Sequence, residues 1–357
     1  MKSPRRFNGS GARSTSGTSE GWKKNHEKTN GCLGAFALLA GLALAGDFPA
    51  FSAPRAMTSG PKDHLFASYY AINAWSADGR YATVPFPVSA VSRDGRWAVS
   101  INYARLRLTR PDYGYGGNGQ NARADTVWPE DDGLWLVDLA SGEARLIVTI
   151  ASVRDRMPAV KDPKALAYFC HTVFSRDGSK IFWLARTVEN LVGQKVVRKW
   201  ETTSFTCNRD GSGVRRCFPD GWGGSHFNWL DGDRLMVTAK FKDAVWSHVL
   251  FTPGKEDFTR LGRGLLDFDG HGVFSDDGRW MATDTYPDKL SERKLMVMRM
   301  ADHAVLPLGA FFVPELYREQ YSRCDLHPRW RPDGKMMAFN SVHDGTRQVY
   351  VVDVTPP

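Results

Sequence analysis

One phrase of sequence recurs along the chain and constrains its fold more than any other feature. A short apolar strand is followed by a turn that contains Asp-Gly and by a second apolar strand, as in FSDDGRWMATD at residues 274–284. Asp-Gly favours a tight turn, because glycine tolerates a positive φ and aspartate can accept hydrogen bonds from its own turn. Each copy of the phrase therefore predicts a β-hairpin.

The copies centre on Gly79, Gly95, Gly178, Gly232, Gly278 and Gly334. A β-hairpin repeat of roughly 45–55 residues is typical of a β-propeller, in which each four-stranded blade packs on its neighbours. We predict an all-β fold, a single β-propeller of four-stranded blades over residues 66–357, with six or seven blades and seven preferred. Five units are clear. The first, near Trp75, is short, so it is either incomplete or closed by strands from the other end of the chain.

Three segments precede the predicted propeller. Residues 1–31 are polar and basic and are expected to be disordered. Residues 32–46, CLGAFALLAGLALAG, form an apolar run that is too short for a comfortable membrane span and resembles the core of a signal peptide or a signal anchor. Residues 47–65 are expected to be a linker. We therefore expect a periplasmic or secreted protein, with an N-terminal membrane anchor if the run is not cleaved, and a cytoplasmic protein as the alternative.

The net charge of +8 is concentrated at the N-terminus. Residues 1–56 hold eight Lys or Arg and three acidic residues, a net +5, which leaves +3 for the predicted propeller. Since no basic stripe with interleaved aromatic residues is present, we expect no nucleic-acid partner. A mildly basic body could still attract an anionic substrate through a local patch. We expect the chain to act as a monomer.

Four histidines occupy the same position in four repeats, at the start of the first strand: His171, His226, His271 and His327. In a propeller the first strand of each blade lines the centre, so equivalent positions should converge at one end of the ring. Imidazoles that converge can bind a divalent metal or act as bases near neutral pH. The alternative is that these histidines cap backbone groups where a blade begins.

The cysteines leave several alternatives open. Cys324 precedes His327 by three residues and could join it as a metal ligand, which would favour zinc over manganese, or it could be a buried apolar residue. Cys207 and Cys217 lie on two arms of one hairpin and could form a disulfide in an exported protein.

Residues 151–167 are the best candidate for a helix or a loop.

A second group of polar residues lies between predicted strands in the unit at 86–150. An insertion at 109–130 interrupts this unit, and long loops often carry function. Arginine can bind a carboxylate through two hydrogen bonds and tyrosine can stack on a sugar. The alternative is that the arginines lie along a strand surface and the tyrosines stiffen the loop. The candidates are Arg105, Arg107, Arg110, Tyr113 and Tyr115.

Several enzyme classes are excluded by missing motifs. The predicted propeller, residues 66–357, contains no G-x-S-x-G element, so it carries no nucleophile motif of the hydrolase domain that accompanies some propellers. It also contains no phosphate-binding P-loop.

Two segments resemble the propellers of oligogalacturonate lyases and related polysaccharide lyases: DGHGVFSDDGRWMATDTYPD at 269–288 and the C-terminal segment 324–354. The F-S-x-D-G phrase itself resembles the WD40-like repeats of TolB-type propellers. In the lyase family a metal is held by histidines and a glutamine, partly in a Q-x-x-H-x-H arrangement. Here His327 matches that motif, Cys324 replaces the glutamine and Arg329 replaces the second histidine.

The resemblance implies β-elimination on an acidic, uronate-containing oligosaccharide or polysaccharide, with a divalent metal (Mn or Zn). It places His226, His271, His327 and Cys324 at the metal and His171 as the base, while Arg105, Arg110 and Tyr113 contact the substrate. The competing interpretation is a non-catalytic, TolB-like propeller that binds protein or glycan in the periplasm. A lyase that has lost its activity is a third.

Overall fold

The chain divides into two compact units, Met1–Ala45 and Gly46–Pro357. The computed structural model describes residues 50–56, 72–75, 81–84, 86–111, 113–116, 120–160, 165–189, 199–218, 222–240, 245–318 and 322–355, all in the second unit. The predicted disordered segment 1–31 and apolar run 32–46 therefore lie outside the described residues.

Four sheets of four antiparallel strands follow one another along the chain, each with its strands in chain order. The first two sheets comprise β5 (Ala90–Val91), β6 (Trp97–Ser100), β7 (Gly133–Asp138) and β8 (Ala144–Thr149), then β9 (Leu166–Phe174), β10 (Lys180–Glu189), β11 (Lys199–Asn208) and β12 (Arg215–Arg216). The next two comprise β13 (Gly223–Trp229), β14 (Leu235–Lys240), β15 (Trp246–Phe251) and β16 (Phe258–Leu261), then β17 (Val273–Phe274), β18 (Trp280–Asp284), β19 (Glu292–Arg299) and β20 (Val305–Phe312).

A fifth sheet joins the two ends of the described chain. Its C-terminal strands are β21 (Arg329–Trp330), β22 (Met336–Ser341) and β23 (Gln348–Thr355), and β1 (Ala50–Phe51) and β2 (Arg55–Ala56) both pair with β23. The short first unit contributes a separate two-stranded sheet, β3 (Ile72–Trp75) and β4 (Tyr81–Val84). Strands from the beginning of the chain thus complete the last sheet rather than the first.

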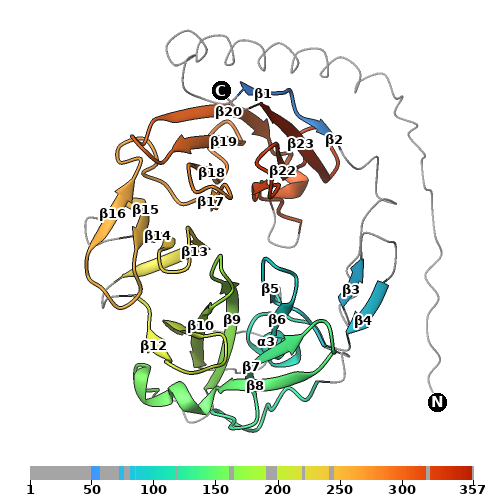
Figure 1. The fold of residues 1–357 in the computed structure, drawn as a ribbon, viewed down its shortest axis with the longest axis vertical. Helices are drawn as coiled ribbons and strands as arrows, with labels where there is room; N and C mark the ends of the chain where they lie inside the picture. Colours follow the sequence, from blue (N-terminus) through green and yellow to red (C-terminus); the bar gives the residue numbers. More distant parts are fainter. Residues whose placement is uncertain are drawn as a thin grey trace, which may run out of the picture. The chain divides into compact units, whose positions relative to one another are not determined.

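Consecutive sheets meet through their first strands. β5 contacts β9, β9 contacts β13, β13 contacts β17, and β17 contacts β21. Figure 1 shows the sheets succeeding one another around a common centre, with these first strands innermost. The predicted all-β propeller with four-stranded blades is therefore confirmed, while the number of blades stays a prediction.

Large apolar side chains fill the space between neighbouring sheets. Phe182 on β10 lies 4.5 Å from Phe227 on β13, measured between ring centroids, and Phe311 on β20 lies 4.9 Å from Phe339 on β22. Trp183, which is fully buried, stacks on Phe205 of the neighbouring strand at 5.6 Å. Each such side chain stabilises the fold by roughly 1.5–3 kcal/mol through its burial. These contacts fix the sheets firmly enough to position side chains at the centre.

Two segments differ from their predictions. The stretch after β6, where one alternative placed the arginines along a strand surface, forms a helix, α3 (Tyr103–Thr109), because the Asn102 side chain caps it by accepting a hydrogen bond from the Arg105 N–H at 2.9 Å. Within the predicted helix or loop at 151–167, a 3-10 helix covers Ala151–Arg156, but Leu166 already belongs to β9. A further 3-10 helix spans Glu315–Tyr317.

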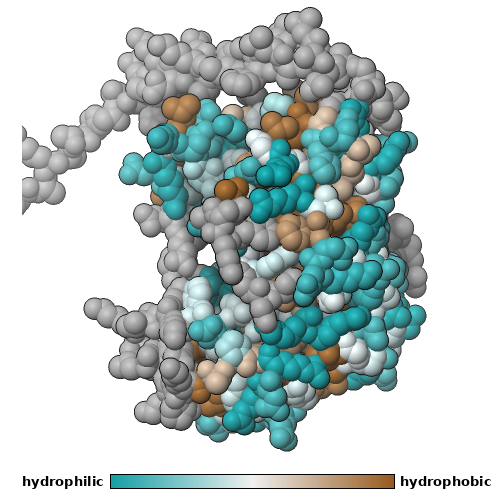
Figure 2. Space-filling model, turned by 90° about the vertical axis from the view of Figure 1, so that its left-hand side faces the viewer, coloured by the Kyte–Doolittle hydropathy of each residue, from teal (hydrophilic) through white to brown (hydrophobic). Residues whose placement is uncertain are grey.

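Cys170, Cys207, Cys217 and Cys324 are buried free thiols, so the predicted alternative of a Cys207–Cys217 disulfide is not what the structure contains. The outer edge around β13–β16, which faces the viewer in Figure 2, is largely hydrophilic with small separate hydrophobic areas. Among the described residues, no helix is long and apolar enough to span a bilayer.

Candidate functional site

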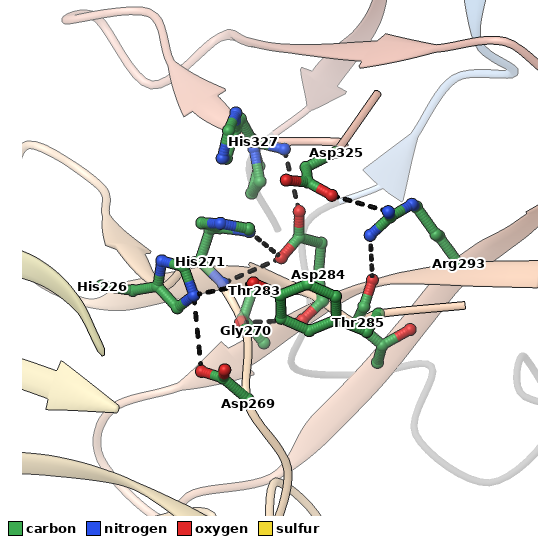
Figure 3. A network of polar contacts seen from close by, with 12 residues as sticks. His226, Asp269, Gly270, His271, Thr283, Asp284, Thr285, Arg293, Asp325 and His327 are labelled. Atoms are coloured by element: carbon green, nitrogen blue, oxygen red, sulfur yellow. Dashed lines mark hydrogen bonds and ion pairs between the residues drawn. The ribbon is translucent and has the colours of Figure 1, made fainter. Parts of the chain in front are cut away.

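Three of the four aligned histidines meet where first strands come together. His226 lies on β13, His271 lies two residues before β17, and His327 lies two residues before β21. The ring centroids of His226 and His271 are 3.8 Å apart, and those of His271 and His327 are 3.9 Å apart. Figure 3 shows the three rings side by side, with carboxylates beneath and beside them. Positions 45 to 101 residues apart in sequence thus form one cluster, because neighbouring first strands are in contact.

An unusual backbone conformation aims these side chains. His171, His226 and His327 have positive φ angles of 56°, 55° and 44°, a region that few residues other than glycine adopt. The ladder between β13 and β14 shifts register at His226, between Ser225 and Phe227, which marks a β-bulge. A bulge redirects a side chain and a left-handed residue costs roughly 1–3 kcal/mol. The same costly feature at three equivalent positions indicates that the ring architecture maintains it.

Asp284, the last residue of β18, connects two of the histidines. Its side chain is fully buried. Its Oδ1 accepts hydrogen bonds from the backbone N–H and from Nδ1 of His271, both at 2.8 Å, and its Oδ2 accepts one from the backbone N–H of His327 at 2.9 Å. Burial by itself would raise the pKa of Asp284, but the His271 side chain and the two backbone donors outweigh it and hold the pKa at about 2.

The ionised Asp284 fixes the tautomer of His271. Because a carboxylate can only accept, Nδ1 of His271 must carry the proton, which leaves the lone pair on Nε2 available. Gly270 makes this close approach feasible, since a Cβ there would lie 2.0 Å from the backbone oxygen of Asp284. Thr283, next to Asp284, is held in turn by the buried His248 through a 2.9 Å contact from Nε2 to Oγ1.

Asp325 joins two of the histidines to form a potential ligand set. One nitrogen of His271, one nitrogen of His327 and one oxygen of Asp325 all lie within 4.8 Å of one another, and we call these three residues the His–Asp group. Burial, followed by the charge of His271, lowers the pKa of His327 to about 4, so that its ring is neutral at pH 7. Two imidazoles and one carboxylate are donors that suit a divalent transition metal, so the residues fit such an ion.

His226 lies beside the His–Asp group and has partners of its own. Its Nε2 is 3.4 Å from Asp269 Oδ1 and 3.3 Å from the hydroxyl of Tyr286. Burial and then the charge of His271 lower the pKa of His226 to about 3. Burial raises the pKa of Asp269 to about 6 and that of Tyr286 to about 12, the latter with help from the Asp269 charge. At neutral pH, therefore, the ring of His226 is unprotonated and the hydroxyl of Tyr286 is protonated. His226 itself was expected to be a metal ligand, but it lies outside the three-residue set.

Two arginines complete this side of the site. Nη2 of Arg293 lies 2.6 Å from Asp325 Oδ1, and this side chain is fully buried. Nη2 of Arg323 lies 2.9 Å from Asp325 Oδ2, and this side chain is 37% exposed. Both guanidinium groups lie against the ring of Tyr286, at 5.6 Å and 5.4 Å from its centroid.

His171 lies apart from this cluster, beside other aromatic residues. Its ring centroid is 6.1 Å from that of Tyr113 and 6.3 Å from that of Phe227. His171 as a residue is exposed, but protein surrounds its ring on several sides. This partial enclosure, together with the charges of Arg186 and Arg110, lowers the pKa of His171 to about 3. Arg110 stacks over the rings of Tyr113 and Trp200, at 4.4 Å and 4.7 Å. The expected base and two of its expected neighbours thus lie together.

Arg105 was expected to contact substrate, and the structure corrects this. Its side chain is 1% exposed, and its guanidinium donates to backbone carbonyl oxygens of Ala167, Arg123, Thr126 and Val127 at 2.6–2.9 Å. The α-helical turn points it into the protein and away from solvent. Arg105 therefore ties the insertion at 109–130 to β9. Tyr115 stiffens the same loop by stacking on Tyr103 at 4.7 Å.

Cys324 also differs from the prediction. It is 4% exposed and packs in an apolar cluster with Val313, Val342 and Tyr317. Burial raises the pKa of its thiol, which disfavours the thiolate that would bind a metal. Asp325, the next residue, is the one that lies beside the histidines.

Sequence reasoning missed Asp269, Asp284, Asp325, Tyr286, Arg293 and Arg323. A signal was present for two of them, since Asp-x-His occurs at both Asp269–His271 and Asp325–His327. Nothing in the sequence near Asp284 distinguishes it from the acids of surface turns.

The comparisons with known proteins agree with this architecture. No family model matches the chain and no curated protein matches it. Among solved structures, an oligogalacturonate lyase in complex with manganese matches with a TM-score of 0.53 and 18% identity, over 81% of this chain and 72% of that one. An oligogalacturonate lyase from Vibrio parahaemolyticus gives 0.52 and 15%, over 80% and 72%. TolB from Acinetobacter baumannii gives 0.46 and 14%, over 81% and 60%. The similarity to the two lyases shows a shared propeller fold.

Proposed function

We propose that this protein is an exported, metal-dependent polysaccharide lyase that cleaves a uronate-containing oligosaccharide or polysaccharide by β-elimination. The observation that carries the proposal is the His–Asp group, which lies with His226 at the centre of a fold shared with a manganese-bound lyase. The resemblance of segments 269–288 and 324–354 to that family adds support.

The His–Asp group would hold the divalent cation. When bound, the cation would neutralise the C6 carboxylate of the uronate and stabilise the charge that develops as the C5 proton leaves. The Asp325 carboxylate takes the place expected for the Cys324 thiolate, and this harder ligand shifts the preference from zinc, which a cysteine ligand would favour, toward manganese.

Two histidines could remove the C5 proton. His226 is neutral, adjoins the His–Asp group and is oriented by Asp269, while His171 lies near Tyr113 and Arg110. Tyr286, which stays protonated at neutral pH, could protonate the departing O4. Arg110 and Tyr113 would contact other parts of the sugar chain.

Product formation tests the proposal directly. We expect purified protein with Mn²⁺ to generate unsaturated uronates, detected by ultraviolet absorbance, from at least one member of a panel of uronate polymers, and a chelator to abolish the signal. His226→Gln and His171→Gln should separate the two candidate bases, since only the substitution that removes the true base should reduce the rate by a factor of about 10²–10⁴. Absence of product from every substrate would refute the lyase.

A TolB-like, non-catalytic propeller that binds protein or glycan is the second candidate. The observation that favours it is the altered ligand set, in which Cys324 lies in an apolar cluster and Arg329 stands where the family motif has histidine. Metal analysis of the purified protein discriminates the two, because a lyase of this kind should retain a stoichiometric ion that His271→Ala or His327→Ala releases.

Export rests on the apolar run at 32–46. We expect the protein in the periplasmic or secreted fraction of the producing cell. N-terminal sequencing should show either cleavage after Ala45 or an uncleaved anchor. Recovery only from the cytoplasm would contradict this part of the proposal.

A further inference from the structure

The two oxygens of Asp325 each face an arginine, and the two arginines differ in their freedom. Arg293 is 1% exposed and also donates to the backbone oxygen of Thr285 at 3.1 Å, so it is a fixed part of the interior. Arg323 is 37% exposed. Of the two guanidinium groups, only that of Arg323 can leave Asp325 without being stranded in the interior.

Asp325 is also the carboxylate of the His–Asp group. A divalent cation held by His271 and His327 would approach the same oxygens that Arg323 contacts. Two positive charges a few ångströms apart repel strongly even at the effective dielectric constant of a protein surface. The cation and Arg323 must therefore compete for Asp325.

The surroundings of Arg323 indicate where its guanidinium would act once released. It lies over the ring of Tyr286, whose hydroxyl contacts His226. Burial lowers the pKa of Arg323, but the Asp325 charge and then the phenols of Tyr286 and Tyr113 outweigh it and raise the pKa. Arg323 therefore lies beside Tyr286 as well as Asp325, next to the His–Asp group. Guanidinium groups bind carboxylates through paired hydrogen bonds.

We propose that Arg323 is an anion-recognition residue that exchanges partners: a divalent cation takes Asp325, and Arg323 then binds the carboxylate of the ligand on that cation. The inference rests on the metal site of the proposed function, but it does not depend on any reaction being catalysed. It predicts that metal and carboxylate ligand bind with positive coupling through this residue.

Calorimetric titration with Mn²⁺ alone tests the first half. We expect Arg323→Gln to bind Mn²⁺ about tenfold more tightly than the wild type, because a competing charge is gone. Arg323→Lys, which keeps the charge, should bind close to the wild-type value. Arg331→Gln is the matched control, since Arg331 forms an exposed pair with Asp333 at 2.7 Å, and it should change nothing. Equal or weaker Mn²⁺ binding by Arg323→Gln would overturn the proposal.

Titration with D-galacturonate, with and without saturating Mn²⁺, tests the second half. In the wild type Mn²⁺ should raise the affinity for the sugar acid about tenfold or more, and in Arg323→Gln that gain should be clearly smaller, because only the direct attraction between cation and carboxylate remains. An undiminished gain in the variant would overturn the exchange. If neither protein binds Mn²⁺, the metal site and the exchange both fail. If binding and coupling occur but no polymer is cleaved, the proposed lyase activity is contradicted while the partner exchange of Arg323 is supported.

Discussion

Asp284 ends β18 and His327 precedes the first strand of the next sheet, yet the carboxylate of Asp284 accepts a 2.9 Å hydrogen bond from the backbone N–H of His327, 43 residues further along the chain. The same carboxylate orients the ring of His271. One buried acid therefore sets the spacing between two potential metal ligands on neighbouring blades.

Asp284→Asn should weaken metal binding. The amide group cannot accept all three hydrogen bonds, and its NH₂ would face the donors of His271. We expect the affinity for Mn²⁺ to fall by about 10–100-fold, the range typical for loss of a carboxylate behind a ligating histidine. Calorimetry measures this, with Asp277→Asn, in an exposed turn, as the control. Unchanged affinity in Asp284→Asn would show that the carboxylate does not organise the site.

Arg105→Met should destabilise the protein without affecting its ligand affinity. The substitution leaves four carbonyl oxygens around the buried guanidinium without their donors, and each buried unsatisfied group costs about 1–3 kcal/mol. We expect the free energy of unfolding to fall by at least about 3 kcal/mol in urea denaturation. Arg107→Met, at an exposed position of the same helix, should lie within about 0.5 kcal/mol of wild type. A stable Arg105→Met protein with weakened sugar binding would restore the substrate-contact role.

Cys324→Ala should leave metal binding intact. Its thiol lies in an apolar cluster and outside the His–Asp group, so only packing is lost, at a cost of about 1 kcal/mol. We expect an affinity for Mn²⁺ within about twofold of wild type, measured by calorimetry. His327→Ala, by comparison, should abolish binding. A large loss in Cys324→Ala would reinstate the thiolate as a ligand.

Acidification should destabilise the metal-free protein. Burial is the main cause that lowers the pKa of His226 to about 3 and of His248 and His327 to about 4, whereas unfolded histidines titrate near 6.5. Below about pH 6.5 the unfolded state therefore binds more protons than the folded state, and the free energy of unfolding falls as the pH falls. Asp269 acts in the opposite direction, because burial raises its pKa to about 6.

The destabilising effect of the three histidines exceeds the stabilising effect of Asp269. We expect the free energy of unfolding to fall by a net amount on the order of 3 kcal/mol between pH 7 and pH 5.5. The exposed ring of His171 is left out, since water screens it. Thermal melts in chelator at half-unit pH steps measure the effect. A melting temperature that stays constant across this range would mean that these rings titrate normally in the folded protein.

Local chemistry made the architecture predictable. Asp-Gly turns are specified by a few adjacent residues, so the hairpins could be recognised one by one and their repetition implied the ring. The histidines at equivalent repeat positions could be placed near one another for the same reason. Of the four aligned histidines, His171 lies outside the cluster and shows the limit of that argument. An equivalent position in the repeat does not fix the distance between side chains of different blades.

Tertiary contacts decided what the sequence could not show. Arg105 reads as a strand residue until Asn102 is seen to cap a helix there. Asp284 ends a strand like many surface acids, and only the approach of the next blade buries it. Cys324 and Asp325 are adjacent, and the choice of which one faces the histidines depends on the path of a loop that no local pattern specifies.

The pairing of β1 and β2 with β23 has a consequence for biosynthesis. Arg55 bonds to Asp353, 298 residues away, and Phe51 pairs with Val354. The ribosome must finish almost the whole polypeptide before these partners can meet, so a chain terminated early would leave β1 and β2 without the strand they bind. The final sheet thus makes completion of synthesis a condition for closing the ring.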